Sequence, residues 1–493
     1  MNRFENYFQK TGFPIDSIII RQDGKTLYEA YYMPYGKHTL HRMFSAAKSY
    51  TSLAIGVLYA KGLLDLDAPV TGFFPEYSSI NQSGELKKTT VRNLLMMRSP
   101  YAKTTYKIKE THDWVKSFFE AGADHEPGMI FQYDTSAALV LGALVKKISG
   151  MGVLDYLRSV FLSKIGFSEE AYLMTAPGNA EHTGSGLMAY PGDLLVTGDF
   201  LLSLLNGSLE TDCPGLLSAE YDSGFWRKYA EYVRLATSFQ SATAHAGKTR
   251  SERCGYGYQF WVLPKDGFMM YGMGGQYLCV YPEKKQLFVT TADTQSEAGG
   301  TQKLLDVVEE ISEDIFHADF SNNRFNTNCD IRLDIGIRSE ANTRINPEAN
   351  PETNPEANPE TNPISNPETK SGKGLSSLYG TYRIVKKESP FLSYRFTKDE
   401  LILYKADENY VIPYRCKGYA EPVAWSDDLN VCAKAEFMPD GSCYLHVRLV
   451  GEIFGCIHLL LCRKESKGLL YMRKVEESAL SEFNGFFDSM IEE

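Results

Sequence analysis

Residues 41–53 read HRMFSAAKSYTSL and contain a Ser-x-x-Lys pattern at Ser45 and Lys48. Apolar residues at helical spacing predict a helix from about 44 to 61, and Gly62 stands where a helix commonly ends. In such a helix the serine and the lysine lie one turn apart on the same face. A partly desolvated lysine can be neutral and take the serine proton, while the helix N-terminus favours an oxyanion. The spacing alone does not distinguish a nucleophile pair from an ordinary surface serine and lysine.

The segments around this helix predict an α+β unit. Apolar and β-branched runs predict strands near both ends of the first 320 residues, and helical patterns lie between and after them. Strands drawn from distant segments are expected to form one antiparallel sheet. The expected strands are 17–20, 26–32, 256–263, 268–273, 277–281 and 286–291, and the further helices are 135–148, ended by Gly150, and 301–316.

A repeat separates this unit from the rest of the chain. Residues 346–369 read NPEANPETNPEANPETNPISNPET, and proline at every fourth position blocks helices and sheet ladders. We therefore predict a first domain at 1–320, a linker at 321–374 and a second domain at 375–493. Short aromatic and β-branched runs predict that the second domain is all-β, a lipocalin-like barrel or a sandwich, with a terminal helix.

Composition excludes several classes of function. The 493 residues carry a formal net charge of −11, which argues against a nucleic-acid binder and against electrostatic attachment to a membrane. No stretch approaches the ~18 apolar residues of a membrane span, and the N-terminus has no secretory pattern. The nine cysteines are scattered without a Cys-x-x-Cys pair, so we expect neither a disulfide framework nor a zinc site, and a cytoplasmic location.

Two further phrases identify the family that the helix resembles. GLLDLDAPV at 62–70 and TVRNLL at 90–95 follow HRMFSAAKSYTSL in the order typical of the serine β-lactamase and penicillin-binding-protein superfamily. The resemblance covers about residues 15–320 and is nearest to the class C-like esterase and amidase branch, which includes nylon-oligomer hydrolases. It implies a serine β-lactamase-like fold with a helical subdomain. It also implies that Ser45 is the nucleophile and Lys48 its proton acceptor.

The second motif of this family is Tyr-x-Asn, which the segment EPGMIFQYDTSA at 126–137 matches in part. By resemblance, Tyr133 shuttles protons with Lys48, and we expect the lysine cation to lower the pKa of the phenol. Asp134 and Thr135 are then expected on the substrate side. Thr135 replaces the family's asparagine, so the amide that would orient a substrate is missing. A half-buried structural tyrosine is the alternative for Tyr133.

The third motif, Lys-Thr-Gly or His-x-Gly in relatives, corresponds to FMMYGMGGQ at 268–276. In this registration Gly272 is the motif glycine, and the Met273 backbone N–H completes an oxyanion hole with that of Ser45. Gly272 and Gly274 are expected to let the backbone approach the substrate closely. Met270 replaces the motif's cation, which classical enzymes use to bind a substrate carboxylate. The alternative is an ordinary strand that ends in a glycine-rich bend.

Together the motifs predict a serine hydrolase that forms a covalent acyl-enzyme with an ester or amide of a small molecule or short peptide. The departures at Thr135 and Met270 point away from a classical β-lactamase. An acyltransferase of the same fold and a catalytically silent binding protein remain alternatives. No metal or organic cofactor is implied, and the oligomeric state is left open. His41, Arg42 and His182 could line the site, although isolated histidines are more often structural.

Overall fold

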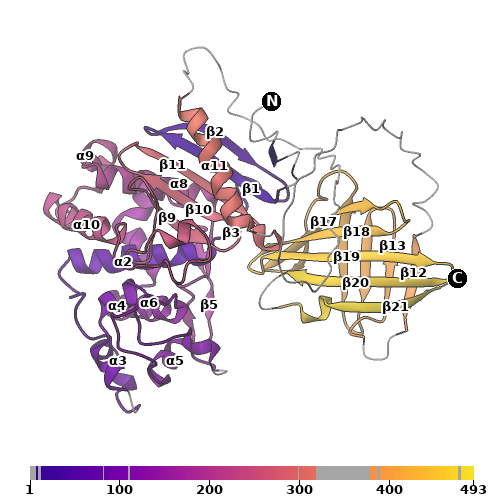
Figure 1. The fold of residues 1–493 in the computed structure, drawn as a ribbon, viewed down its shortest axis with the longest axis horizontal. Helices are drawn as coiled ribbons and strands as arrows, with labels where there is room; N and C mark the ends of the chain where they lie inside the picture. The colour runs from indigo at the N-terminus through magenta and orange to yellow at the C-terminus, as the bar shows by residue number, and fades with distance from the viewer. Residues whose placement is uncertain are drawn as a thin grey trace, which may run out of the picture.

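The computed structural model describes residues 7–317 and 378–492, apart from 9, 10, 12, 81, 82, 109, 110, 298, 386–388 and 476–478. The described chain forms an N-terminal unit of sheet and helices and a C-terminal barrel beside it (Figure 1). Each has its own hydrophobic core. The predicted linker, including the repeat at 346–369, lies outside the described residues, so the domain boundaries stay predictions.

The N-terminal unit is built on the antiparallel sheet that the sequence predicts. Its strand order is β2-β1-β11-β10-β9-β8, so strands from both ends of the unit pair directly. The β1–β2 hairpin turns at Asp23 and Gly24, which both have positive φ. The strands are β1 Ile15–Gln22, β2 Lys25–Tyr31, β8 Trp261–Val262, β9 Phe268–Gly272, β10 Gln276–Tyr281 and β11 Gln286–Ala292.

Helices cover both faces of this sheet, which is why every β11 residue is buried. On one face α8 packs closely, since a Cβ at Gly198 would lie 2.8 Å from Leu278. On the other face the Tyr277 hydroxyl donates to the Thr301 carbonyl of α11 at 3.0 Å. The helices are α2 Ala47–Ala60, α3 Gly84–Lys88, α4 Val91–Leu95, α5 Trp114–Glu120, α6 Thr135–Ser149, α7 Val153–Leu157, α8 Pro191–Leu205, α9 Leu209–Asp212, α10 Ser223–Ala236 and α11 Gly300–His317.

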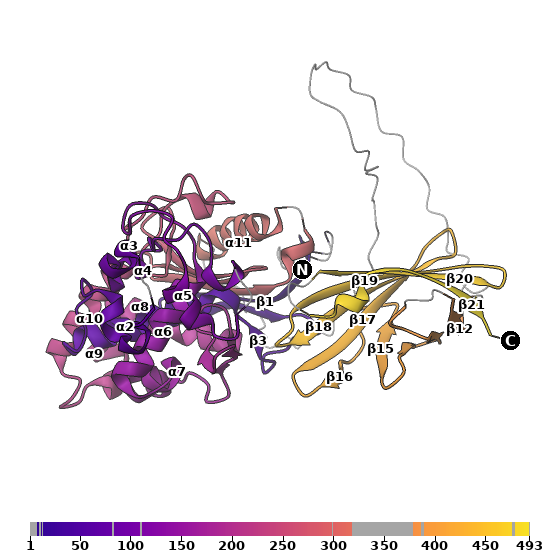
Figure 2. The ribbon, with the colours of Figure 1, turned by 90° about the horizontal axis from the view of Figure 1, so that it is seen from below.

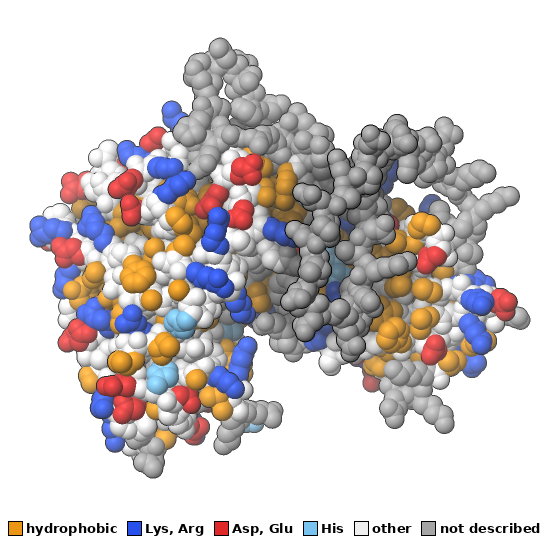
Figure 3. Space-filling view, in the orientation of Figure 1, with side chains coloured by type: hydrophobic (Ala, Val, Ile, Leu, Met, Phe, Trp, Pro, Cys, Tyr) orange, Lys and Arg blue, Asp and Glu red, His pale blue; other side chains and the backbone are white. Residues whose placement is uncertain are grey.

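Further helices and short strands surround α2 on the side away from α11 (Figures 1 and 2). The α6 helix begins after Asp134 and ends at Gly150, which has φ +75°, as its sequence predicts. The minor strands are β3 His41–Arg42, β4 Tyr172–Leu173, β5 Thr175–Ala176, β6 Ala180–Glu181 and β7 Leu187–Ala189. Basic and acidic side chains are interspersed on the face of this unit that Figure 3 shows.

The strand expected at 256–263 is wrong in extent, because only Trp261 and Val262 pair with β9. Gly257 approaches the Ala236 carbonyl so closely that a Cβ would lie 2.0 Å from its oxygen, and Gln259 has φ +63°. A turn at Gln259 is incompatible with a continuous strand. The apolar residues before it are buried as loop, not as sheet.

The C-terminal unit is a closed antiparallel barrel, which confirms the all-β prediction and selects the barrel over the sandwich. Among the described residues nine strands close through a parallel β15–β17 contact, and β16 adds at β17. The strands are β12 Gly380–Ile384, β13 Ser393–Phe396, β14 Glu400–Tyr404, β15 Asn409–Arg415, β16 Val423–Ser426, β17 Leu429–Phe437, β18 Cys443–Gly451, β19 Gly455–Lys464, β20 Lys467–Val475 and β21 Gly485–Ile491.

The terminal helix expected in this unit is wrong. Residues 485–491 form β21 instead, which pairs with β12 and β20. Phe487 is buried in the barrel core whereas Phe486 is 61% exposed, the alternation of a strand with one buried face. Among the described residues no single helix is long and apolar enough to cross a membrane; α6 and the stretch 153–165 meet that test only as a pair bent by 55°.

Candidate active site

Ser45 lies in a short 3-10 turn, Phe44–Ala46, that leads directly into α2. The preceding strand β3 pairs with β7, and the Met43 N–H donates to the Leu187 carbonyl at 2.8 Å. Phe44 has φ +44°, a conformation that an aromatic residue adopts only when its surroundings hold it there. This backbone places Ser45, which is half-buried, at the start of the predicted helix.

Lys48 lies one turn after Ser45 and is 1% exposed. Its Nζ donates to the Ser45 Oγ at 3.0 Å and to the Gly184 carbonyl at 2.5 Å. Burial lowers the pKa of Lys48 to about 7, while the Asp134 carboxylate opposes that shift and the Lys107 cation adds to it. A large fraction of Lys48 is therefore neutral near pH 7 and able to accept a proton.

Tyr133 approaches the same pair from the loop before α6. The Lys48 Nζ lies 4.9 Å from the centre of its ring, and the ring stacks on Trp261 at 5.7 Å. Burial raises the pKa of Tyr133 above its ordinary value, and a hydrogen bond with Ser45 only partly offsets this. The expected lowering of the Tyr133 pKa is therefore wrong. The buried lysine carries too little charge at neutral pH to outweigh desolvation of a phenolate.

Asp134 and Thr135, which were expected on the substrate side, lie at the start of α6. The Asp134 carboxylate is fully buried and accepts hydrogen bonds from the Ser136 N–H at 2.9 Å and the Ser99 hydroxyl at 3.2 Å. It caps α6 and acts on Lys48 by charge. Thr135 packs its methyl group closely against Gly184, the residue whose carbonyl accepts from Lys48.

The segment Gly272–Gly275 forms a tight turn between β9 and β10, in which the Gly275 N–H donates to the Gly272 carbonyl at 3.3 Å. A Cβ at Gly272 would lie 2.1 Å from the Met43 carbonyl oxygen, so β9 and the nucleophile turn touch through their backbones. Gly274 and Gly275 have φ +87° and +101°. Gln276 is fully buried, and its amide donates to the Met273 carbonyl at 2.8 Å and to the Ala292 carbonyl at 2.7 Å. That bracing role was not predicted from the sequence.

The remaining candidate residues are Met270, His182, His41 and Arg42, and each has contacts within the protein. Met270 is fully buried in the core, so it contacts no ligand from solvent. His182 is buried beside Trp114, and burial together with Lys48 lowers its pKa to about 3. The His41 Nε2–H donates to the Asp16 carboxylate at 3.1 Å. Arg42 donates to the Glu452 carbonyl of the barrel at 2.7 Å.

The barrel contacts the nucleophile turn directly. Val450 and Phe454, from the end of β18 and the following turn, form a small apolar cluster with Tyr35, Phe44 and the half-buried Met273. The rings of Phe44 and Phe454 meet edge to face at 5.5 Å. The residues just before Ser45 and at the predicted oxyanion position are thus packed from the C-terminal unit.

A buried ionic group joins the two units next to this cluster. Arg448 of β18 is 2% exposed and donates to the Asp16 carboxylate at 2.9 Å, while its Nε lies 3.8 Å from the Asp293 carboxylate. The cation and a hydrogen bond from His41 hold the pKa of Asp16 below its ordinary value despite complete burial. This arginine and its two carboxylates form a buried ionic contact between the barrel and the N-terminal unit.

Comparison with known proteins places residues 2–311 in a match to the family model described as Beta-lactamase. Protein flp of Staphylococcus aureus is 23% identical over 186 residues, 35% of this chain and 37% of flp. The human mitochondrial serine beta-lactamase-like protein LACTB is 23% identical over 293 residues, 39% of this chain and 54% of LACTB. The matches thus span about a third to a half of these relatives.

Among solved structures, the octameric penicillin-binding protein homologue from Pyrococcus abyssi is 16% identical. The two chains align with a TM-score of 0.47, over 99% of this chain and 98% of that one.

Proposed function

The chain belongs to the beta-lactamase family, and from that premise we propose that it is a serine hydrolase of the esterase or amidase type. Ser45 is the nucleophile, Lys48 the base and Tyr133 the acid. The observation that carries the proposal is the contact between Lys48 Nζ and Ser45 Oγ, 3.0 Å long, made by a lysine whose pKa burial lowers to about 7. A nucleophile within hydrogen-bond reach of a neutral base is the arrangement that covalent acyl transfer requires.

In the first step the Ser45 oxygen attacks the substrate carbonyl while Lys48 takes its proton. The backbone N–H groups of Ser45 and Met273 stabilise the oxyanion that forms. Collapse of this intermediate breaks the bond to the leaving alcohol or amine, which takes a proton from Tyr133 as Lys48 reprotonates the phenol. Because burial raises the pKa of Tyr133, it stays protonated near pH 7 and serves as an acid. Water then attacks the acyl-enzyme, and the same groups move the protons in the reverse direction. The carboxylic acid product is released, and Ser45 is regenerated.

The surroundings of Ser45 favour a substrate with an apolar acyl group. Tyr133 stacks on Trp261, and the adjoining loop carries Met129 and Ile130 at 71% and 45% exposed. Met270 stands where classical enzymes carry the cation for a substrate carboxylate, and it is buried. These features support small esters or amides over penicillins.

An activated fluorophosphonate tests the proposal, because it labels a serine only where a base has activated it. We expect the wild type to be labelled at Ser45, as read by mass spectrometry of the tryptic peptide, and Ser45→Ala to remain unlabelled. Ser49→Ala is the matched control, since this neighbouring hydroxyl donates to the Gln259 carbonyl at 2.7 Å and has no catalytic role here. Labelling of Ser45→Ala equal to the wild type would disprove the assignment.

Product analysis then separates the reaction classes. A hydrolase converts a short-chain ester to the free acid, whereas an acyltransferase passes the acyl group to an added alcohol or amine. A chromogenic cephalosporin tests β-lactamase activity, for which we expect slow turnover or none. A wild type that is neither labelled nor active on esters and amides would favour the silent binding protein.

A further inference from the structure

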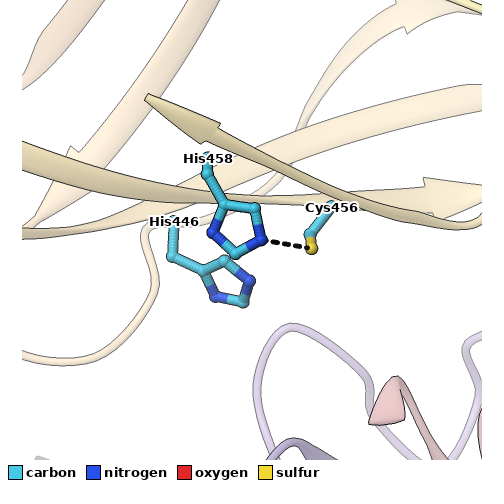
Figure 4. A group of neighbouring side chains, drawn as sticks. All are labelled: His446, Cys456 and His458. Atoms are coloured by element: carbon cyan, nitrogen blue, oxygen red, sulfur yellow. Dashed lines mark hydrogen bonds between the residues drawn. The ribbon is translucent and has the colours of Figure 1, made fainter. Parts of the chain in front are cut away.

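Three potential metal ligands lie together on the outer face of the barrel, although the sequence analysis predicted no metal site. His446 belongs to β18, and Cys456 and His458 belong to β19 (Figure 4). One ligand atom from each residue lies within 4.8 Å of the other two. Leu445 and Val447 point into the barrel core, so His446 between them points outward. His446 and His458 are directly opposite in the antiparallel register, which aligns their side chains.

We propose that His446, Cys456 and His458 bind a Zn²⁺ ion. The His458 Nε2 lies 3.6 Å from the Cys456 Sγ. Two ligands of tetrahedral zinc at its usual Zn–S and Zn–N distances are about 3.6 Å apart, so this pair already has the required spacing. Two imidazoles and a thiolate are ligands that zinc prefers, and three protein ligands leave a fourth position for water.

The second nitrogen of each imidazole already has a partner of the kind found behind metal-bound histidines. The Tyr419 hydroxyl lies 2.6 Å from His446 Nδ1, and the Tyr444 hydroxyl lies 2.6 Å from His458 Nδ1. With the proton on Nδ1, each ring donates to its tyrosine oxygen and presents the Nε2 lone pair to a metal. Such partners fix the tautomer and the ring orientation of a ligand.

The charges around the three residues are mixed. Arg448 lies across from Cys456 and Arg473 across from His458. Burial and the Asp293 carboxylate raise the pKa of the Cys456 thiol, and the two cations only partly oppose this. Arg448 is itself balanced by the Asp16 and Asp293 carboxylates. The thiolate supplies the negative charge that a bound zinc ion needs here.

Cys456 is buried, while His446 and His458 are half-buried, so the site can be reached from solvent on the imidazole side. It lies beside Arg448, which is directly opposite Cys456 in the antiparallel register. The proposed zinc lies beside the ionic contact that Arg448 makes between the two units, and its binding can be measured without reference to hydrolysis.

Metal binding to the full chain tests this proposal, with Zn²⁺ and Co²⁺ as probes. We expect one equivalent of Zn²⁺ in competition with a chromogenic chelator, and a Co²⁺ complex with tetrahedral visible bands and a thiolate charge-transfer band. Cys456→Ser should lose the charge-transfer band and the stoichiometric Zn²⁺. Tyr419→Phe should weaken Zn²⁺ binding about 10–100-fold, because it removes only the partner behind His446.

Cys416→Ser and His112→Gln are the controls, since both remove an exposed ligand-type side chain elsewhere. Circular dichroism checks that each variant folds, and His446→Asn replaces Cys456→Ser if the latter does not. A wild type without stoichiometric Zn²⁺, or equal binding by the wild type and folded ligand variants, would overturn the proposal. A Co²⁺ complex without a thiolate band would do the same.

Discussion

Lys48 can act as a base only while it is neutral, which ties activity to pH. Burial lowers its pKa to about 7, so the neutral fraction increases as pH rises through that value. We expect kcat/KM for an ester substrate to rise about tenfold per pH unit below pH 7 and to level off above it. A pH–rate profile that stays flat across this pKa would contradict the role of Lys48.

Tyr133 should matter most when the leaving group is poor. As the proton donor to the leaving group, it contributes about 10²–10⁴-fold to the rate for an amide and far less for an activated aryl ester. Steady-state kinetics of Tyr133→Phe on both substrates measure this difference. Tyr31→Phe, which removes a hydroxyl bonded to Glu29 on the distant edge strand, is the control. An equal loss on both substrates would indicate a structural role only.

For individual residues, the sequence predicted which side chains lie together better than it predicted their protonation states. Ser45 and Lys48 meet because they are one helical turn apart, whereas Tyr133 was expected beside them only from the family resemblance. The pKa of Tyr133 depends on how much solvent the assembled fold removes, which no local pattern encodes. The Gly184 carbonyl that accepts from Lys48 was missed for the same reason, since it lies 136 residues away along the chain.

Among the structural elements, β9 and the nucleophile turn are in backbone contact at Gly272. Gly272→Ala would bring a Cβ to 2.1 Å from the Met43 carbonyl oxygen. We expect the two elements to separate, the rate of Ser45 labelling to fall by more than tenfold, and stability to decrease by about 1–3 kcal/mol. Gly192→Ala in α8 is the control, because a Cβ there meets nothing within 4 Å. Wild-type labelling by Gly272→Ala would exclude this coupling.

Elements with a local stop signal were predicted closely, and those fixed by distant contacts were not. Gly62 and Gly150 end α2 and α6 within two residues of the expected positions. The strand expected at 256–263 fails because contacts with Ala236 override its β propensity. The expected terminal helix is a strand because the barrel needs β21 between β12 and β20 to close.

For the whole molecule, Arg448 is the main ionic link between the units. Arg448→Met would leave the Asp16 and Asp293 carboxylates buried without their cation. We expect this to lower the free energy of unfolding by about 3–5 kcal/mol. We expect faster hydrogen exchange at residues 41–46 and 449–454, as the two surfaces separate. Arg395→Met, which removes an exposed arginine of the barrel, should leave both segments unchanged. Unchanged exchange in Arg448→Met would show that the remaining contacts, such as the apolar cluster and the hydrogen bond from Arg42 to the Glu452 carbonyl, hold the units together without it.

The sequence predicted the two folded units but not their contact surface. Arg448 and Asp16 are 432 residues apart, and neither belongs to a motif. The sequence of β18 does not show whether Arg448 is buried or exposed. The alternation of side chains along a strand shows only that Arg448 lies on the outer face of the barrel, not what covers that face. The family resemblance ends near residue 320 and says nothing of the barrel.

The packing of Phe454 against Phe44 has a consequence for how such a protein can change over generations. A barrel exchanged for another by recombination would remove the ring that supports the residue before the nucleophile. Keeping this contact requires that both units be exchanged together, although each has a core of its own. We expect substitutions in the turn after β18 to occur together with substitutions at Phe44 and Met273 in related sequences.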